Sequence, residues 1–180
     1  VALFTTISSA EQTISENIIL TGETKKINLT SKNWSSIKFE IYGENKGNTN
    51  FIIKGEKGKL NLFKGINSYI RLRSAQKNYH GGRPHKDTDY PSNSKRWHTI
   101  NITRTGDWKG SVRVYDSETG EEVFPVNGDR VEDRYLFHVF EEKKGEFKPE
   151  KIVLKSNKPS ERGKFRNIRI SYEDDEESKN

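Results

Sequence analysis

Residues 37–41 read Ile37-Lys38-Phe39-Glu40-Ile41, so apolar and charged side chains alternate strictly along this stretch. Successive side chains of a β-strand point to opposite faces, and the alternation therefore predicts a strand with one apolar face and one charged face. The same period of two recurs at residues 100–102, 112–114 and 168–172. Alternation of this kind is typical of antiparallel sheets that bury one face and expose the other.

Further strands are predicted where Ile, Val, Thr, Tyr and Phe fill the apolar positions. These segments are residues 17–20, 24–29, 50–54, 60–62, 68–73, 135–140 and 151–154. The first two fit a pair around Thr21-Gly22-Glu23, and hairpin-like turns are predicted at 43–48, 54–58, 105–107 and 116–120. Many short strands without a βαβ pattern predict an all-β, antiparallel β-sandwich.

Length and charge shape the expected organisation of the chain. The 180 residues fit one sandwich domain over 1–172, followed by an acidic tail at 173–180 that is expected to be disordered. The net charge is +6, but without residues 173–177 and Lys179 the body holds 31 basic and 21 acidic side chains, a net +10. A basic body favours polyanionic partners, whereas scattered Lys and Arg also serve to solubilise a sheet surface.

Several classes of protein are excluded by composition. The chain has no Cys, which excludes disulfides, thiolate metal sites and a cysteine nucleophile. No apolar run is long enough for a membrane span. Glycosylation sequons begin at Asn28, Asn33 and Asn101, and residues 1–4 fit the remnant of a secretion signal, so we expect a secreted or extracellular protein.

Three segments resemble the laminin G and related concanavalin A-like jelly rolls. They are Trp97–Arg104, Gly110–Asp116 and Phe165–Ile170, and the resemblance covers mainly residues 69–172. The resemblance implies a jelly-roll sandwich. The chain lacks the disulfide usual near the closing strand of laminin G domains, the alternating Glu-Asp-Glu run of the hydrolases with this fold, and the His-x-Asn-x-Arg motif of galectins.

The long segment 75–96 has no apolar periodicity and is predicted to be a loop. Aromatic faces stack on sugars, while Arg and His form charge-assisted hydrogen bonds to hydroxyls or carboxylates. The predicted ligand-binding residues are Tyr79, His80, Arg83, His85 and Tyr90 of this loop, with Trp108 nearby. The alternative is a loop whose polar side chains are simply solvated. Trp97 is expected to lie in the sandwich core.

Metal binding is a weaker expectation for the same loop. Asp87 and Asp89 are alternate carboxylates that could converge on calcium, a cation that prefers oxygen ligands. A zinc site formed by His80, His85 and Asp87 is an alternative with a less diagnostic pattern. No other cofactor is expected.

The sequence favours a non-catalytic domain that binds carbohydrate or an acidic polysaccharide. One alternative is a structural subunit that self-associates in an extracellular particle or filament. A second is a polysaccharide lyase or hydrolase, in which Tyr79 or Tyr90 would work with His80 or His85 and Arg83 would neutralise a uronate. Nucleic acid is not expected as a partner, and no catalytic residue is assigned.

Overall fold

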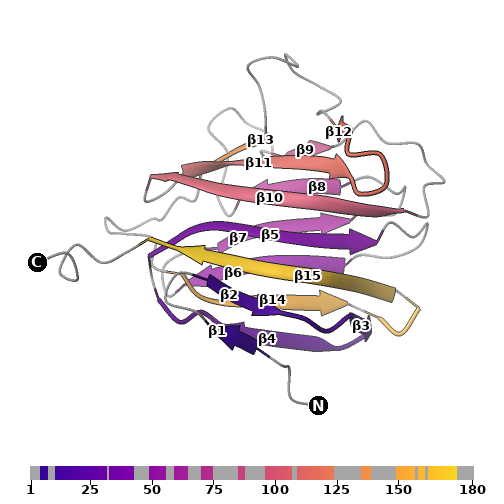
Figure 1. Ribbon diagram of the computed structural model, residues 1–180. Coiled ribbons are helices and arrows are strands. Elements are labelled where there is room, and N and C mark those ends of the chain that lie inside the picture. Colours follow the sequence, from indigo (N-terminus) through magenta and orange to yellow (C-terminus); the bar gives the residue numbers. More distant parts are fainter. Residues whose placement is uncertain are drawn as a thin grey trace, which may run out of the picture.

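Two antiparallel sheets packed face to face form the protein (Figure 1). The computed structural model describes residues 5–7, 11–31, 33–42, 49–55, 59–64, 70–74, 85–87, 96–106, 109–123, 135–138, 149–156, 158–160 and 162–173. Within these ranges the regular elements are all strands, and every strand pairing is antiparallel. The predicted all-β, antiparallel jelly-roll sandwich is therefore confirmed.

Sheet A is the larger layer and lies toward the viewer in Figure 1. Its main strand order is β1-β2-β15-β5-β10-β11-β12, with β3 pairing β15 and β13 pairing β11. The strands are β1 (Thr5–Ile7), β2 (Glu11–Ile14), β3 (Ile18–Thr21), β5 (Trp34–Tyr42), β10 (Trp97–Gly106), β11 (Lys109–Asp116), β12 (Glu122–Val123), β13 (Tyr135–His138) and β15 (Arg162–Tyr172). The longest strands, β15, β5 and β10, therefore lie side by side in its centre.

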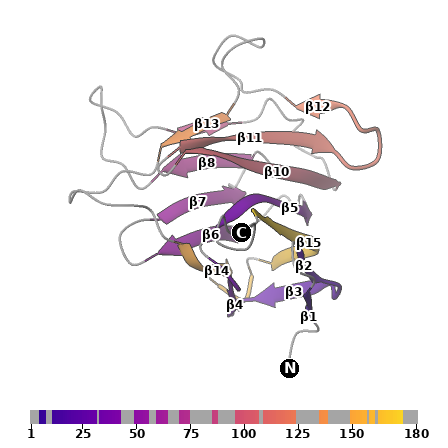
Figure 2. The same ribbon diagram turned by 60° about the vertical axis from the view of Figure 1, so that its left-hand side comes forward.

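Sheet B lies behind sheet A, and the turned view in Figure 2 separates the two layers. Its strand order is β4-β14-β6-β7-β8-β9. The strands are β4 (Thr24–Asn28), β14 (Pro149–Ser156), β6 (Thr49–Gly55), β7 (Lys59–Lys64), β8 (Ile70–Ser74) and β9 (His85–Asp87). The chain switches between the sheets several times, so neighbouring strands in sequence often belong to opposite layers.

The core forms where the alternate apolar residues of both sheets meet. Phe39 of sheet A stacks on Phe51 of sheet B, with ring centroids 3.7 Å apart, and Phe165 tilts against both rings. All three side chains are at most 1% exposed. Burying a phenylalanine stabilises a fold by about 1.5–3 kcal/mol, so these rings anchor one layer on the other.

Two predicted hairpins are wrong because the chain crosses between the sheets. β3 pairs with β15 in sheet A and β4 pairs with β14 in sheet B, so the segments 17–20 and 24–29 are not partners. Gly22 links them with φ of +84°, a conformation that favours glycine, and its N–H donates to Ser156 Oγ at 2.8 Å. Likewise β5 and β6 belong to different sheets, although 43–48 was predicted as a hairpin turn.

Further differences come from weak local signals. The predicted loop 75–96 contains β9, a three-residue edge strand that pairs with β8. Its sequence His-Lys-Asp has no apolar alternation, and only pairing with a neighbour makes it a strand. Trp97 was expected in the core, but it is half-buried on the solvent side of sheet A, whereas Trp34 is 1% exposed.

Candidate functional site

The central strands of sheet A carry charged and polar residues on the side that faces away from sheet B. On β5, Ile37, Phe39 and Ile41 are buried in the core, so Lys38 and Glu40 between them point to the opposite side. This side is called the outer face of sheet A. The alternation seen in the sequence thus separates the core of the sandwich from a solvent-facing polar surface.

A pocket of about 320 Å³ opens on this outer face, and it is called the outer-face pocket. Its lining comes from β5, β10, β15 and the turn after β11. The lining residues are Lys38, Phe39, Glu40, Thr99, Ser117, Asn167 and Arg169. A pocket of this volume is within the range that holds small ligands, and its lining side chains are polar, since the ring of Phe39 packs in the core.

A β-bulge in β15 shapes the pocket. Arg166 pairs with Glu40 and Arg169 pairs with Lys38, so two residues of β15, Asn167 and Ile168, oppose the single Phe39 of β5. Asn167 has φ of +53°, and Asn is one of the few non-glycine residues that tolerates this region. Bulges re-aim side chains, and this one turns Asn167 toward the pocket while Ile168 stays buried.

Glu40 is held in a fixed position inside the pocket. Arg166 donates two hydrogen bonds to its carboxylate, at 3.1 and 3.3 Å, and the Asn167 amide donates a further one. Burial alone would raise the pKa of Glu40, but hydrogen bonds from Arg166, Asn167 and Ser117 outweigh it and hold the pKa below its usual value. Glu40 is therefore an ionised, oriented hydrogen-bond acceptor at neutral pH.

A tight turn after β11 brings Ser117 over the pocket. Asp116 is 6% exposed, and its Oδ1 accepts from the backbone N–H groups of Glu118 and Thr119, at 2.8 and 3.2 Å. Burial opposes ionisation of Asp116, but these bonds and an ion pair with Arg96 at 2.8 Å lower its pKa. Ser117 then lies 2.8 Å from the Thr99 hydroxyl, oxygen to oxygen.

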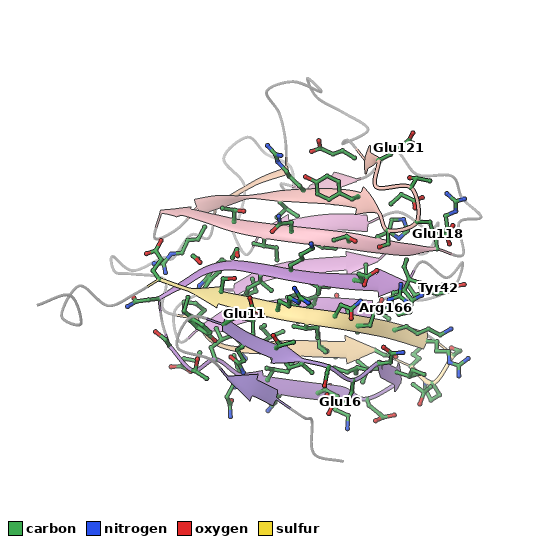
Figure 3. The ribbon with its side chains drawn as sticks, in the orientation of Figure 1. Glu11, Glu16, Tyr42, Glu118, Glu121 and Arg166 are labelled. Carbon is green, nitrogen blue, oxygen red and sulfur yellow. The ribbon has the colours of Figure 1, made fainter. Side chains whose placement is uncertain are left out.

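An aromatic pair extends the outer face beside the pocket. The rings of Tyr42 and Trp97 meet edge to face, with centroids 5.3 Å apart. The Arg166 guanidinium lies 4.0 Å from the centroid of Trp97, and the Lys164 ammonium lies 4.5 Å from that of Tyr42. Figure 3 labels Arg166 and Tyr42 toward the same end of β15 and β5. Arg166 therefore joins the aromatic pair to Glu40.

Two cations at the other end of the pocket have a different environment. Lys38 and Arg169 are exposed, and they are direct partners on adjacent strands. Within the described residues neither forms an ion pair with a carboxylate, in contrast to the Arg166–Glu40 pair. Like charges directly opposite each other destabilise a sheet, so the stability of the sheet does not explain why Lys38 and Arg169 face each other.

The structure does not test the ligand site predicted from sequence, because most of its residues lie outside the described ranges. His85 and Asp87 belong to β9, at the edge of sheet B, and only their backbone is described. Tyr79, His80, Arg83, Asp89, Tyr90 and Trp108 lie outside the described residues. The predicted calcium and zinc ligands fall on these same positions. Elsewhere in the described chain, no group of three or more His, Asp or Glu side chains could hold a metal ion.

Sequence reasoning missed the outer-face pocket, although one signal pointed to it. The alternation at 37–41 placed Lys38 and Glu40 on the solvent side of a strand, as the structure confirms. The partners of these two residues come from β10, β15 and a turn more than fifty residues away in sequence. The bulge at Asn167 did have a local signal that was missed, because the consecutive polar residues Arg166 and Asn167 interrupt the alternation between Phe165 and Ile168.

No family model and no curated protein sequence matches this chain. Solved structures do share its fold. The LG1-3 region of the laminin alpha2 chain has a TM-score of 0.54 at 13% identity. The match covers 87% of this chain and 31% of the laminin region. The Caenorhabditis elegans galectin LEC-6 has a TM-score of 0.50 at 10% identity, covering 87% of this chain and 96% of the galectin.

A third similar structure is the Crh5 transglycosylase in complex with NAG, with a TM-score of 0.54 at 8% identity, covering 88% of this chain and 73% of the transglycosylase. This chain thus spans about a third of the laminin region and most of the other two proteins. The fold is a concanavalin A-like jelly roll, as the sequence resemblance implied. Within the described residues no helix is long and apolar enough to cross a membrane.

Proposed function

We propose that this chain is a secreted, non-catalytic carbohydrate-binding domain whose ligand occupies the outer-face pocket. The observation that carries the proposal is the arrangement around Glu40. An ionised carboxylate, the Asn167 amide and the hydroxyls of Thr99 and Ser117 converge on one cavity. Fixed acceptors and donors of this kind match the hydroxyl groups of a sugar ring.

The jelly-roll fold supports this proposal, because a galectin and a transglycosylase solved with NAG share it. The chemistry of the pocket favours binding over hydrolysis. Glycoside hydrolysis ordinarily uses two carboxyl groups on either side of the bond that is cleaved, one of them with a raised pKa. Of the described residues that line the pocket, Glu40 alone carries a carboxylate, and its pKa is lowered.

The loop 75–96 is the second part of the proposal. Tyr79, His80, Arg83, His85 and Tyr90, with Trp108, would form a separate contact surface. Asp87 and Asp89 are proposed as calcium ligands. His85 and Asp87 lie on β9 of sheet B, whereas the outer-face pocket is lined by strands of sheet A. Variants of the loop and variants of the pocket therefore test the two parts separately.

A glycan array probed with the full 180-residue chain, with and without a calcium chelator, tests the proposal. Asn167→Gly keeps the positive φ and removes the amide, so we expect binding to fall by about tenfold because one hydrogen bond to the sugar is lost. Arg83→Ala tests the loop, and Arg162→Ala on the same strand as Asn167 is the matched surface control. Failure of the wild-type chain to bind any glycan would overturn the proposal.

A further inference from the structure

We infer that the outer-face pocket selects an acidic sugar, whose carboxylate or sulfate group lies between Lys38 and Arg169 while its hydroxyls contact Glu40 and Asn167. This inference rests on the proposed carbohydrate-binding function and names the class of ligand. It depends on the division of the pocket into a cationic end and a carboxylate end.

The cationic end is available for an anion. Lys38 and Arg169 are registered opposite each other, so their Cβ atoms are about 5 Å apart, as for any directly opposed pair. Both side chains extend from the sheet into a lining that they share with Thr99 and Asn167. An anion between the two cations would remove their mutual repulsion and accept hydrogen bonds from both.

Several other cations of this surface are already engaged. Arg166 bonds to Glu40 and stacks on Trp97, and Lys164 lies over Tyr42. Arg113 shares a row of the sheet with Lys38, and a side-chain hydrogen bond with Tyr115 raises the pKa of its guanidinium. Lys38 and Arg169 are the two cations that line the outer-face pocket, and within the described residues neither forms an ion pair with a carboxylate.

The carboxylate end sets the orientation of the sugar. Glu40 follows Lys38 by two residues on the same face of β5, a separation of roughly 6.6 Å along the strand. A simple anion has no hydrogen-bond donor to offer Glu40, whose carboxylate is oriented by Arg166 and Asn167 as an acceptor. A sugar that carries one acidic group and several hydroxyls presents the negative charge to Lys38 and Arg169 and donors to Glu40. The pocket therefore discriminates against plain polyanions as well as against neutral sugars.

The test compares three ligands by isothermal titration calorimetry: a uronate oligosaccharide, the same oligosaccharide with its carboxylates reduced to alcohols, and polyphosphate of matched charge. The variants are Lys38→Gln and Arg169→Gln. The control is Arg162→Gln, which removes the same charge from an exposed position seven residues away on β15, or about 20 Å along the strand. We expect the wild type to prefer the uronate ligand by about tenfold over the other two.

Lys38→Gln and Arg169→Gln are each expected to abolish that preference, while Arg162→Gln retains it. Equal affinity of the wild type for the uronate and its reduced counterpart would overturn this inference and leave carbohydrate binding intact. The inference would also be overturned if all three variants lost the same affinity for the uronate ligand and the wild type bound polyphosphate as tightly as that ligand. The net positive charge of the surface would then explain the attraction. No binding of either oligosaccharide would count against the proposed function itself.

Discussion

The two faces of sheet A are built from the same strands, but one is buried in the core and the other carries charged and polar side chains. On the inner face, Phe39 and Phe165 pack against Phe51 of sheet B and are almost fully buried. On the outer face, the alternate residues Lys38, Glu40 and Arg169 line the outer-face pocket. Each inner residue gains stability from burial, whereas two of these outer residues repel each other. One strand can thus contribute to stability at one set of alternate positions and, as we propose, to ligand recognition at the other.

Phe51→Ala is expected to have the largest effect on stability. It removes one ring of the stacked pair between the sheets and leaves a cavity, at a cost of about 3–5 kcal/mol. Urea denaturation followed by tryptophan fluorescence measures this loss. Phe51→Leu, which keeps most of the volume, is expected to cost clearly less. Equal stability of the alanine variant and the wild type would show that the inner face is not the stabilising one.

Asp116→Ala should have the next largest effect, because its carboxylate accepts two backbone N–H groups and pairs with Arg96. Loss of bonds to a mostly buried charged group is expected to cost about 2–3 kcal/mol. Asp116→Asn keeps an acceptor for the turn and should lose less. If both variants are as stable as the wild type by thermal denaturation, the turn that positions Ser117 does not depend on this carboxylate.

The pH dependence of stability tests the network around Glu40. Because the pKa of Glu40 is lowered in the fold, its contribution is fully present above the unfolded value, about 4.3, and is lost as the pH falls through the lower folded value. Wild type should therefore exceed Glu40→Gln in stability at pH 7, and the gap should close in acid. A gap that persists unchanged at low pH would contradict an ionised Glu40.

Lys38→Gln and Arg169→Gln should have the smallest effect on stability. Both side chains are exposed, so the change is expected to stay within about 0.5 kcal/mol, with a slight gain from relieved repulsion. Differential scanning calorimetry at low salt measures it. A clear loss of stability in either variant would mean that these cations support the fold, and the contrast between the two faces would weaken.

The sequence was sufficient for the parts of the fold that depend on alternation. Strands β5, β10, β11 and the end of β15 were predicted because every second residue is apolar. Strands β2 and β9 were not predicted, because their short sequences show little apolar alternation. They form strands because a neighbouring strand supplies their hydrogen bonds. The predicted pair around Gly22 failed because a turn sequence does not reveal whether the chain stays in one sheet or crosses over.

The candidate site was predictable only in its chemistry. Lys38 and Glu40 were recognisable as solvent-facing, but their grouping with Thr99 and Asn167 depends on long-range register and on one bulge. The residues that sequence did single out, in the loop 75–96, remain predictions, since their side chains lie outside the described residues. A polar segment is a visible signal of function in sequence, whereas a pocket assembled across three strands is not.

Amide chemical-shift mapping during titration with a uronate oligosaccharide tests whether the ligand binds to the outer face of sheet A. We predict that the largest shifts occur at Lys38, Glu40, Thr99 and the bulge at residues 167–169. The buried positions of the inner face, such as Phe51, should hardly change. Shifts confined to other surfaces, including the loop 75–96, with none around Lys38 and Asn167, would contradict the assignment of recognition to the outer face of sheet A.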